Sequence, residues 1–345
     1  MAHHRALQLF YRGVTLRLIP LTGFVWLSAI MTLGAAPPES SPQSVVFEFA
    51  DLATSRTLLA KEDTYTKALS PFDRKVRMGL QEDPGTRAHL NFMADQAQAW
   101  SAKPKEAVEA AIKALQDPLL SLGIRLKQPI RLIHTTGREE SGAAYTRGSE
   151  IMLPPQETGS LKKPPTRLVA HELFHVISRQ HPRLRDQLYA LIGFKKANPI
   201  NLPSNLAHLK ITNPDAPIIE HVIQLKLSPE QTVTVAPVLI AKHDFRADRQ
   251  KGLFGYLSFK LMQVSQTPDG WEPALAEDGP LYHSPQTPDF ARQIGRNTGY
   301  IIHPEEILAD NFSLLVTDGN ITDRWLTDQI RDTLTTYFAK TTETN

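Results

Sequence analysis

The segment "RLVAHELFHVISRQH", residues 167–181, places His171 and His175 four positions apart, with Glu172 directly after the first histidine. Residues at this spacing share one face of an α-helix, about 5–6 Å apart, so both imidazoles can bind one metal ion. Glu172 points about 100° further round the helix, where it can accept the proton of a metal-bound water but is poorly placed as a third ligand. The H-E-x-x-H pattern therefore predicts a catalytic zinc helix.

The residues around the motif favour a buried helix. Burying one glutamate and two histidines without partners is unfavourable, whereas a metal ion and its water satisfy all three. The apolar residues are Leu168, Val169, Leu173, Phe174, Val176 and Ile177. The chain contains no cysteine, which excludes thiolate metal sites and disulfide scaffolds, so the ligands must be His, Asp or Glu. The simpler alternative is a chance match on a helix that carries two histidines.

Two residues compete for the role of third ligand. His181 stands where H-E-x-x-H-x-x-G-x-x-H has its last histidine, but Ser178 replaces the glycine that allows the chain to turn. If the helix continues, His181 lies about 240° round from His175 and points away from the metal. We therefore interpret His181 as a surface residue just before the helix stop at Pro182, and a site with His181 as third ligand remains an alternative.

The second candidate is Glu306, in "GYIIHPEEILADNF", residues 299–312, where Pro304 suits the first position of a helix. Glu306 and Asp310 lie four apart on one face. A carboxylate at the position of Asp310 can accept a hydrogen bond from a ligating histidine and fix its orientation. The neighbouring Glu305 lacks such a partner four residues later. The alternative is that both glutamates only complement the helix N-terminus.

These two motifs resemble those of the gluzincin metallopeptidases, the family of thermolysin and of the anthrax lethal factor catalytic domain. The resemblance implies a Zn²⁺ ion bound by His171, His175 and Glu306, with Glu172 as general base. Asp310 matches the acidic residue of the second motif and supports a ligating histidine. The resemblance also implies a substrate-binding edge strand before the His helix, within residues 143–154. Tyr300 matches a catalytic tyrosine that some members carry shortly before the ligating glutamate.

We expect an α+β fold: a zincin-like domain with a small sheet packed on the His helix, a β-rich insertion and a C-terminal helical part. The long separation of His175 from Glu306 requires this insertion. The expected domains are residues 37–217 with the His helix, the insertion 218–265, and the helical part 266–345. The expected strands are 45–52, 130–136, 143–155 and three runs within 218–265. The first expected helix covers residues 86–116, is interrupted at 101–106 and stops at Asp117 and Pro118. The other expected helices are 167–181, with Thr166 as N-cap, 183–194, 304–316 and 322–340. Loops are expected at 195–217 and 266–299.

The N-terminus predicts export. Three arginines precede the uncharged run 18–36, which is the pattern of a signal peptide or a membrane anchor, and a polar linker follows at 37–44. We therefore expect an extracytoplasmic protein, either periplasmic or secreted. The formal net charge of +2 becomes −1 without residues 1–36, and no basic patch for nucleic acid is visible.

The functional hypothesis is a zinc peptidase that hydrolyses a peptide or protein substrate. Glu172 takes the proton of the attacking water, and Tyr300 helps to stabilise the oxyanion. Other conceivable donors are His221, His243 and His283, for which we favour structural roles. One alternative is an exported zinc-binding module without peptidase activity. Another is zinc hydrolysis of a different bond, such as an amide in cell-wall peptide.

Overall fold

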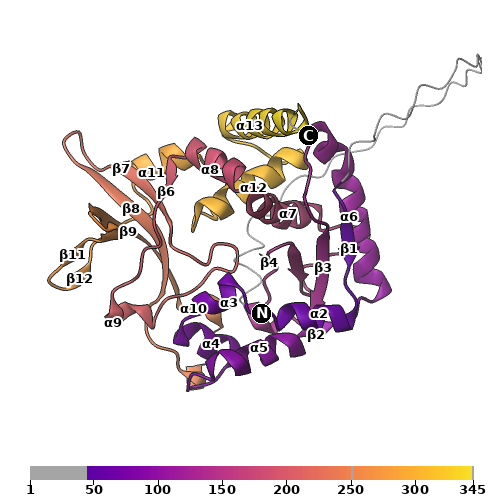
Figure 1. Cartoon of the computed structure of the whole chain (residues 1–345), viewed down its shortest axis with the longest axis horizontal. Helices are drawn as coiled ribbons and strands as arrows, with labels where there is room; N and C mark the ends of the chain where they lie inside the picture. The colour runs from indigo at the N-terminus through magenta and orange to yellow at the C-terminus, as the bar shows by residue number, and fades with distance from the viewer. Residues whose placement is uncertain (1–44, 250–251, 344–345) are drawn as a thin grey trace, which may run out of the picture. The chain divides into compact units, whose positions relative to one another are not determined.

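The computed structural model describes residues 45–249 and 252–343 of the chain (Figure 1). The predicted signal or anchor, residues 1–36, and the linker 37–44 lie outside the described residues. Helices alternate with sheets along the described part, which confirms the α+β class. None of the helices in these residues is long and apolar enough to cross a membrane.

The first sheet has the strand order β1-β3-β5-β4. Its strands are β1 (Phe47–Phe49), β3 (Ile130–Thr135), β5 (Glu150–Leu153) and β4 (Tyr145–Arg147), and β2 (Ala97–Gln98) pairs with β3 off this path. β3 is parallel to β1 and β5, with Leu132 opposite Phe49 on one side and Ile151 on the other, and antiparallel to the short β2. Most of β3 is buried, as its apolar sequence and central position require.

The strand expected over residues 143–155 is in fact a hairpin. β4 and β5 are antiparallel and pair Tyr145 with Met152. The chain reverses near Gly148, whose φ of +61° suits glycine. The single-strand prediction was wrong because it passed over the "RGS" turn signal. The reversal makes β4 the edge strand of the sheet, next to the His helix.

Five helices precede or follow the short strand β2: α2 (Leu52–Leu59), α3 (Thr64–Ala68), α4 (Pro71–Met78), α5 (Gly85–Asp95) and α6 (Ala102–Ser121). The predicted helix 86–116 is interrupted, but earlier than expected: the break lies between Asp95 and Ala102, and residues 102–106, expected to be the interruption, form the first turn of α6. The predicted stop at Asp117 and Pro118 was wrong, since α6 continues for another turn with Pro118 inside it. Proline removes one helical hydrogen bond, but the extra turn buries Leu119 in the core.

The two helices with the sequence motifs are α7 (Thr166–Gln180) and α12 (Pro304–Val316). α12 has the predicted bounds, with Pro304 at its first position. The N-cap prediction for Thr166 was wrong: Pro165 holds that position and Thr166 is the first helical residue. α7 and α12 pack against each other, and the rings of Phe174 and Phe312 lie 5.7 Å apart between centroids.

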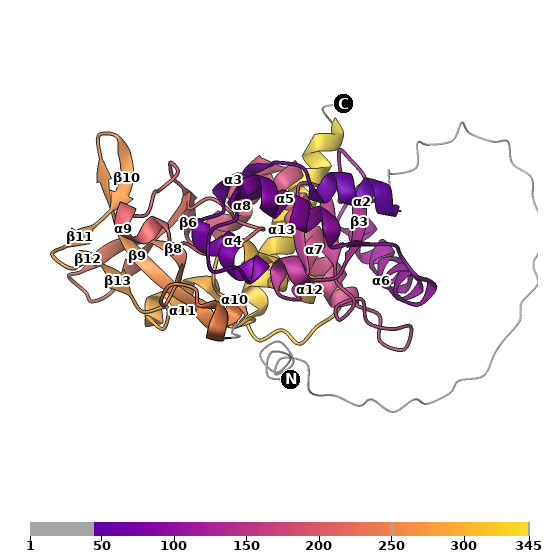
Figure 2. The ribbon, with the colours of Figure 1, turned by 90° about the horizontal axis from the view of Figure 1, so that it is seen from below.

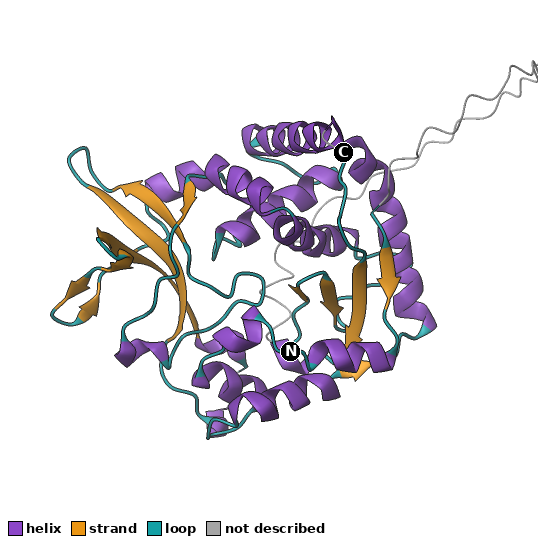
Figure 3. Cartoon of the chain, viewed as in Figure 1, coloured by secondary structure: helices purple, strands orange, loops and turns teal. Residues whose placement is uncertain are grey.

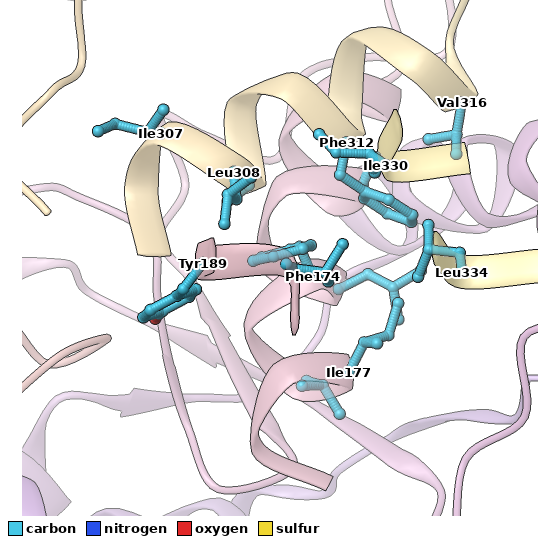
Figure 4. Close-up of a cluster of buried hydrophobic side chains, with 14 of the residues drawn as sticks. Phe174, Ile177, Tyr189, Ile307, Leu308, Phe312, Val316, Ile330 and Leu334 are labelled. Atoms are coloured by element: carbon cyan, nitrogen blue, oxygen red, sulfur yellow. The ribbon is translucent and has the colours of Figure 1, made fainter. Parts of the chain in front are cut away.

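A hydrophobic core surrounds this helix pair (Figure 4). Leu308 and Phe312 of α12 lie over Phe174 of α7, and Leu334 reaches the same cluster from α13 (Arg324–Glu343). α8 (Pro182–Leu191) contributes Tyr189. The predicted helices 183–194 and 322–340 are confirmed, with α8 ending three residues earlier and α13 extending to Glu343.

The second sheet is antiparallel, in the order β10-β9-β8-β7-β6 (Figure 2). Its strands are β6 (Phe194–Lys196), β7 (His221–Lys226), β8 (Thr232–Ala241), β9 (Leu257–Thr267) and β10 (Gly270–Pro273), and β13 (Tyr282–His283) also pairs with β9. The three β-rich runs are confirmed. The sheet also takes strands from 195–217 and 266–299, which were expected to be loops. The predicted domain boundaries at 217 and 265 thus fall within this sheet.

The remaining elements are short. They are α9 (Ser204–Ala207), α10 (Leu253–Tyr256), α11 (Pro288–Ile294), the β11 (Leu275–Ala276) and β12 (Gly279–Pro280) pair, and the 3₁₀ turns η1 (Arg138–Glu140) and η2 (Ala247–Arg249). Figure 3 shows helices α7, α8 and α12 between the two sheets. One core cluster joins residues of β3, α7, α8, α12 and β7, so both sheets pack on the motif helices.

Candidate metal centre

The two histidines of the motif project together from α7. Their ring centroids lie 4.9 Å apart, as the four-residue spacing predicts. The side chain of His175 is fully buried and that of His171 is 12% exposed. The apolar residues of α7 on the other faces lie in the core and fix the direction of both rings.

Glu306 of α12 faces both rings. Its Oε2 atom lies 3.1 Å from Nε2 of His171 and 3.6 Å from Nε2 of His175. The three predicted ligands therefore come together, although the glutamate lies 131 positions after the second histidine in the chain. Nε2 of His175 is buried and has no hydrogen-bond partner in the described part of the chain. A metal ion held between the two histidines and Glu306 would give this atom a partner, so the residue types and their positions fit a metal site.

The outer nitrogen atoms of both rings are held by carboxylates. Nδ1 of His171 lies 3.0 Å from Oδ1 of Asp310, as the spacing within α12 predicts. Nδ1 of His175 lies 2.9 Å from Oε1 of Glu305. Each ring thus turns Nε2 towards the centre, which is how carboxylates orient metal-binding histidines.

The role of Glu305 was missed from the sequence. The sequence suggested Glu305 only as a weaker alternative to Glu306 or as a charge at the helix N-terminus, whereas its partners come from α7 and α8. Its carboxylate accepts hydrogen bonds from Ser178, at 2.5 Å, and from Tyr189. Burial alone would raise the pKa of Glu305, but the hydrogen bond and charge of His175 lower it.

The centre is an acid–base cluster with strongly shifted groups. Burial opposes protonation of His175, but Asp215 and Glu306 raise its pKa to about 9. Burial likewise opposes ionisation of Glu306, but the charge of His175 and the hydrogen bond from His171 lower its pKa to about 2. The carboxylates thus stabilise positive charge at both rings. A metal cation would supply that charge in place of the ring protons.

Glu172 lies beside the histidines and is 3% exposed. One ligand-type atom from each of His171, Glu172 and His175 lies within 4.8 Å of the others. The hydroxyl of Thr146, on edge strand β4, donates to Oε2 of Glu172 at 2.7 Å. The carboxylate is thus held by the sheet, beside the two histidines.

Two residues of the centre come from the segment 195–217, which was expected to be a plain loop. Oδ1 of Asp215 lies 3.9 Å from Nε2 of His175, and Asp215, His175 and Glu306 form a second group with ligand-type atoms within 4.8 Å. Asn213 donates to Oε1 of Glu306 at 2.6 Å. Burial and the charges of Glu172 and Glu306 raise the pKa of Asp215 to about 7, against the lowering effect of His175. No periodic pattern marks these two residues, because they lie on a turn.

Tyr300 is placed next to the centre. Its ring stacks on that of His171, with centroids 6.2 Å apart and planes inclined by 29°. The residue is 43% exposed. Burial around the hydroxyl, together with the charges of Glu306, Asp215 and Asp310, raises its pKa well above 10, so the phenol keeps its proton as a hydrogen-bond donor.

His181 does not join the centre. α7 ends at Gln180 without a tight turn, and Nε2 of His181 lies 2.8 Å from the carbonyl oxygen of Arg125. The expected surface position was wrong, since His181 is only 7% exposed and packs on Phe338. Ser178, which stands where the extended H-E-x-x-H-x-x-G-x-x-H pattern has its glycine, donates a hydrogen bond to Glu305 and so belongs to the site described above.

Three further histidines were considered as hydrogen-bond donors from the sequence: His221, His243 and His283. None of them belongs to either of the two groups of possible metal ligands described above. His221 is buried against Tyr189 and His303. His243 contacts Tyr256, and His283 pairs with Gln263.

Comparison with known proteins gives one family match. Residues 134–183 match the eCIS core domain. This family is a component of extracellular contractile injection systems. The matched segment runs from β3 through the β4–β5 hairpin and α7 to the first residues of α8, so it contains the two histidines and Glu172 but not Glu306. No curated protein matches the chain, and no solved structure does.

Proposed function

We propose that the chain is a zinc-dependent peptidase. The observation that carries the proposal is the position of Oε2 of Glu306, which lies 3.1 Å from Nε2 of His171 and 3.6 Å from Nε2 of His175. Two imidazoles and one carboxylate, without cysteine, form a donor set typical of catalytic zinc sites with an open fourth position. The proposed fold is zincin-like: an antiparallel edge strand, β4, lies beside the His helix, and the second motif helix completes the site.

Zinc, when bound, polarises the scissile carbonyl and lowers the pKa of water to ~7. Glu172 then accepts the proton of the attacking water and passes it to the leaving amine. Thr146 keeps the carboxylate of Glu172 oriented. Tyr300, which retains its phenolic proton, donates a hydrogen bond to the developing oxyanion. Asp310 and Glu305 hold the two rings in position.

Export remains part of the proposal. The basic and then uncharged N-terminal sequence supports an extracytoplasmic location, periplasmic or secreted, with either a cleaved signal or an anchor at 18–36. The substrate we propose is a peptide or protein. The match to the eCIS core domain favours a second candidate function: a component of a contractile injection system that binds the metal but hydrolyses no peptide.

The test uses the full chain, wild type and Glu172→Gln, loaded with zinc and incubated with a mixed peptide library. Because Asp215 lies in the centre, the assay is repeated with Asp215→Asn. We expect one bound zinc per chain in every variant, with cleavage that a chelator and Glu172→Gln both abolish. Failure to bind zinc would overturn the metal site. Bound zinc without cleavage by both the wild type and Asp215→Asn would favour the binding component.

A further inference from the structure

The turn at 213–216 enters the metal centre from outside the two motif helices. Asn213 and Ala216 form an isolated bridge that closes the turn. Its entry is anchored at Thr212, whose backbone N–H donates to Asp73 and whose carbonyl accepts from Arg77. Arg179 of α7 holds the carbonyl of Asp215 at 2.9 Å. The turn is therefore fixed in place by buried polar contacts on both sides of the centre.

Residues of the turn already form hydrogen bonds with the groups that a peptide substrate would need for binding. The backbone N–H of Thr146, on the unpaired edge of β4, donates to Oδ1 of Asp215 at 3.0 Å. An extended substrate adds to such an edge through these same backbone groups. The side-chain amide of Asn213 donates a hydrogen bond to Oε1, the second carboxylate oxygen of Glu306. The edge strand itself is buried, with Tyr145 at 1%, Thr146 at 0% and Arg147 at 5% exposure.

The position of Asp215 also suits a metal ligand. Two ligands of a tetrahedral zinc, each ~2.0–2.1 Å from the ion, lie roughly 3.3 Å apart. Nε2 of His175 lies 3.6 Å from Glu306 and 3.9 Å from Asp215, close to that spacing, and ligand-type atoms of the three residues lie within 4.8 Å of one another. Asp215 is buried beside Glu172 and Glu306, and its Oδ1 lies 3.3 Å from the guanidinium of Arg179 and 3.9 Å from Nε2 of His175.

We propose that Asp215 is a fourth protein ligand of the metal, and that the turn 213–216 keeps the resting chain latent by closing the open coordination position. The inference rests on the proposed zinc site. A catalytic zinc needs its fourth position for water. A carboxylate there excludes water, while the same turn covers the edge of β4. Activity then requires displacement of the turn, and Pro214 of the turn and Pro217 directly after it border a cavity of about 230 Å³.

The variant Asp215→Asn weakens metal coordination by residue 215 but keeps the hydrogen bonds that hold this residue in place. The amide oxygen can still accept hydrogen bonds from Thr146 and Arg179, but a neutral amide is a much weaker metal ligand than a carboxylate. The control is Asp269→Ala, which removes a carboxylate in the exposed turn between β9 and β10. Thermal unfolding of each chain checks that it folds. Zinc affinity is measured by competition with a coloured chelator.

Cobalt and acetohydroxamate report the open position directly. The full chain is loaded with Co²⁺ and titrated with acetohydroxamate, while the visible absorption of the metal is recorded. We expect the cobalt forms of the wild type and Asp269→Ala to bind acetohydroxamate weakly. We expect Asp215→Asn to bind it at least about tenfold more tightly, to hold zinc about tenfold more weakly, and to cleave peptides faster than the wild type.

The outcomes distinguish this inference from the function on which it rests. A chain that binds no metal overturns both. Metal binding with equal acetohydroxamate affinity in the wild type and Asp215→Asn overturns the role of Asp215 alone. Tighter binding in Asp215→Asn without cleavage supports the fourth ligand and overturns the peptidase. Should Asp215→Asn not fold, tight acetohydroxamate binding by the wild type would overturn the inference, and weak binding would support it.

Discussion

Asp310 holds Nδ1 of His171 at 3.0 Å, while Nε2 of the same ring faces Glu306 at 3.1 Å. The ring is thus positioned by one acid of α12 and directed at another. Thr298 in turn donates to the second oxygen of Asp310. The three contacts form a chain from the loop before α12 to the candidate metal centre, so the orientation of His171 depends on a residue that is not among the proposed ligands.

Replacing Asp310 with asparagine is therefore expected to weaken metal binding. The amide keeps the shape but loses the charge that stabilises the ring, and removal of such partners lowers metal affinity about 10–100-fold. Zinc competition with a chelator measures the change. Asp269→Ala serves as the exposed control. Unchanged affinity in Asp310→Asn would show that α7 alone orients His171.

Glu305→Gln tests the equivalent contact for His175. Glu305 is 1% exposed and also accepts from Ser178 and Tyr189, so the variant disturbs three buried hydrogen bonds. We expect a loss of zinc affinity of about 10–100-fold and a loss of stability of about 1–3 kcal/mol. Chelator competition and urea unfolding separate the two effects. The matched control is Glu277→Gln at an exposed position, and equal behaviour of the two variants would contradict the assigned role of Glu305.

Thr146→Val tests how the sheet positions Glu172. Valine has a similar shape to threonine but cannot donate to Oε2 of Glu172. We expect kcat to fall about tenfold with little change in KM, because the carboxylate remains but is less well oriented. The assay uses whichever of the wild type and Asp215→Asn cleaves faster, with the exposed Thr57→Val as control. A change confined to KM would point instead to a role for Thr146 in substrate binding.

The sequence predicted the parts of the site that helical spacing governs. His171 and His175 lie on one face because α7 is regular, and Glu306 and Asp310 lie on one face of α12 for the same reason. The bounds of α12 followed from Pro304 and the apolar stripe. Each of these predictions needs only contacts within one helix, which the local sequence encodes.

The remaining parts depend on contacts between distant segments. Glu305 had no visible partner within its helix, because its partners lie on α7 and α8. Asp215 and Asn213 lie on a turn whose sequence shows only that it is a turn. His181 was expected at the surface, but its burial comes from packing against α13, far along the chain. Local periodicity cannot show such contacts.

His221 provides a pH-dependent test of stability. It is 4% exposed, and neither ring nitrogen has a hydrogen-bond partner in the described residues. Burial, and then the charge of His303, lowers its pKa to about 2. The unfolded chain takes up this proton near pH ~6.5, whereas the folded chain does not. The stability from His221 is therefore complete above pH ~6.5 and is lost as pH falls towards about 2.

The variant His221→Phe removes that titration. Between pH 6 and 4, we expect its free energy of unfolding to fall less steeply than that of the wild type, by up to about 1.4 kcal/mol per pH unit. Burial also lowers the pKa of His89 to about 3 and that of His303 to about 4. These two residues therefore contribute to the pH dependence of stability in both chains. Urea unfolding at several pH values measures it, with the exposed His208→Gln as control. Identical slopes in the wild type and His221→Phe would mean that His221 becomes protonated in the folded chain.

Phe312→Ala tests whether the core holds the two motif helices together. Phe312 is fully buried on α12 and packs on Phe174 of α7, so its loss leaves a cavity between the helices that carry the site (Figure 4). We expect destabilisation of about 3–5 kcal/mol and weaker zinc binding, because Glu306 is less firmly placed. The control Phe254→Ala, at a 45% exposed position, should change stability by about 0.5 kcal/mol or less. Urea unfolding with and without zinc measures both effects. A destabilised Phe312→Ala chain with wild-type zinc affinity would show that the metal ligands do not depend on this packing.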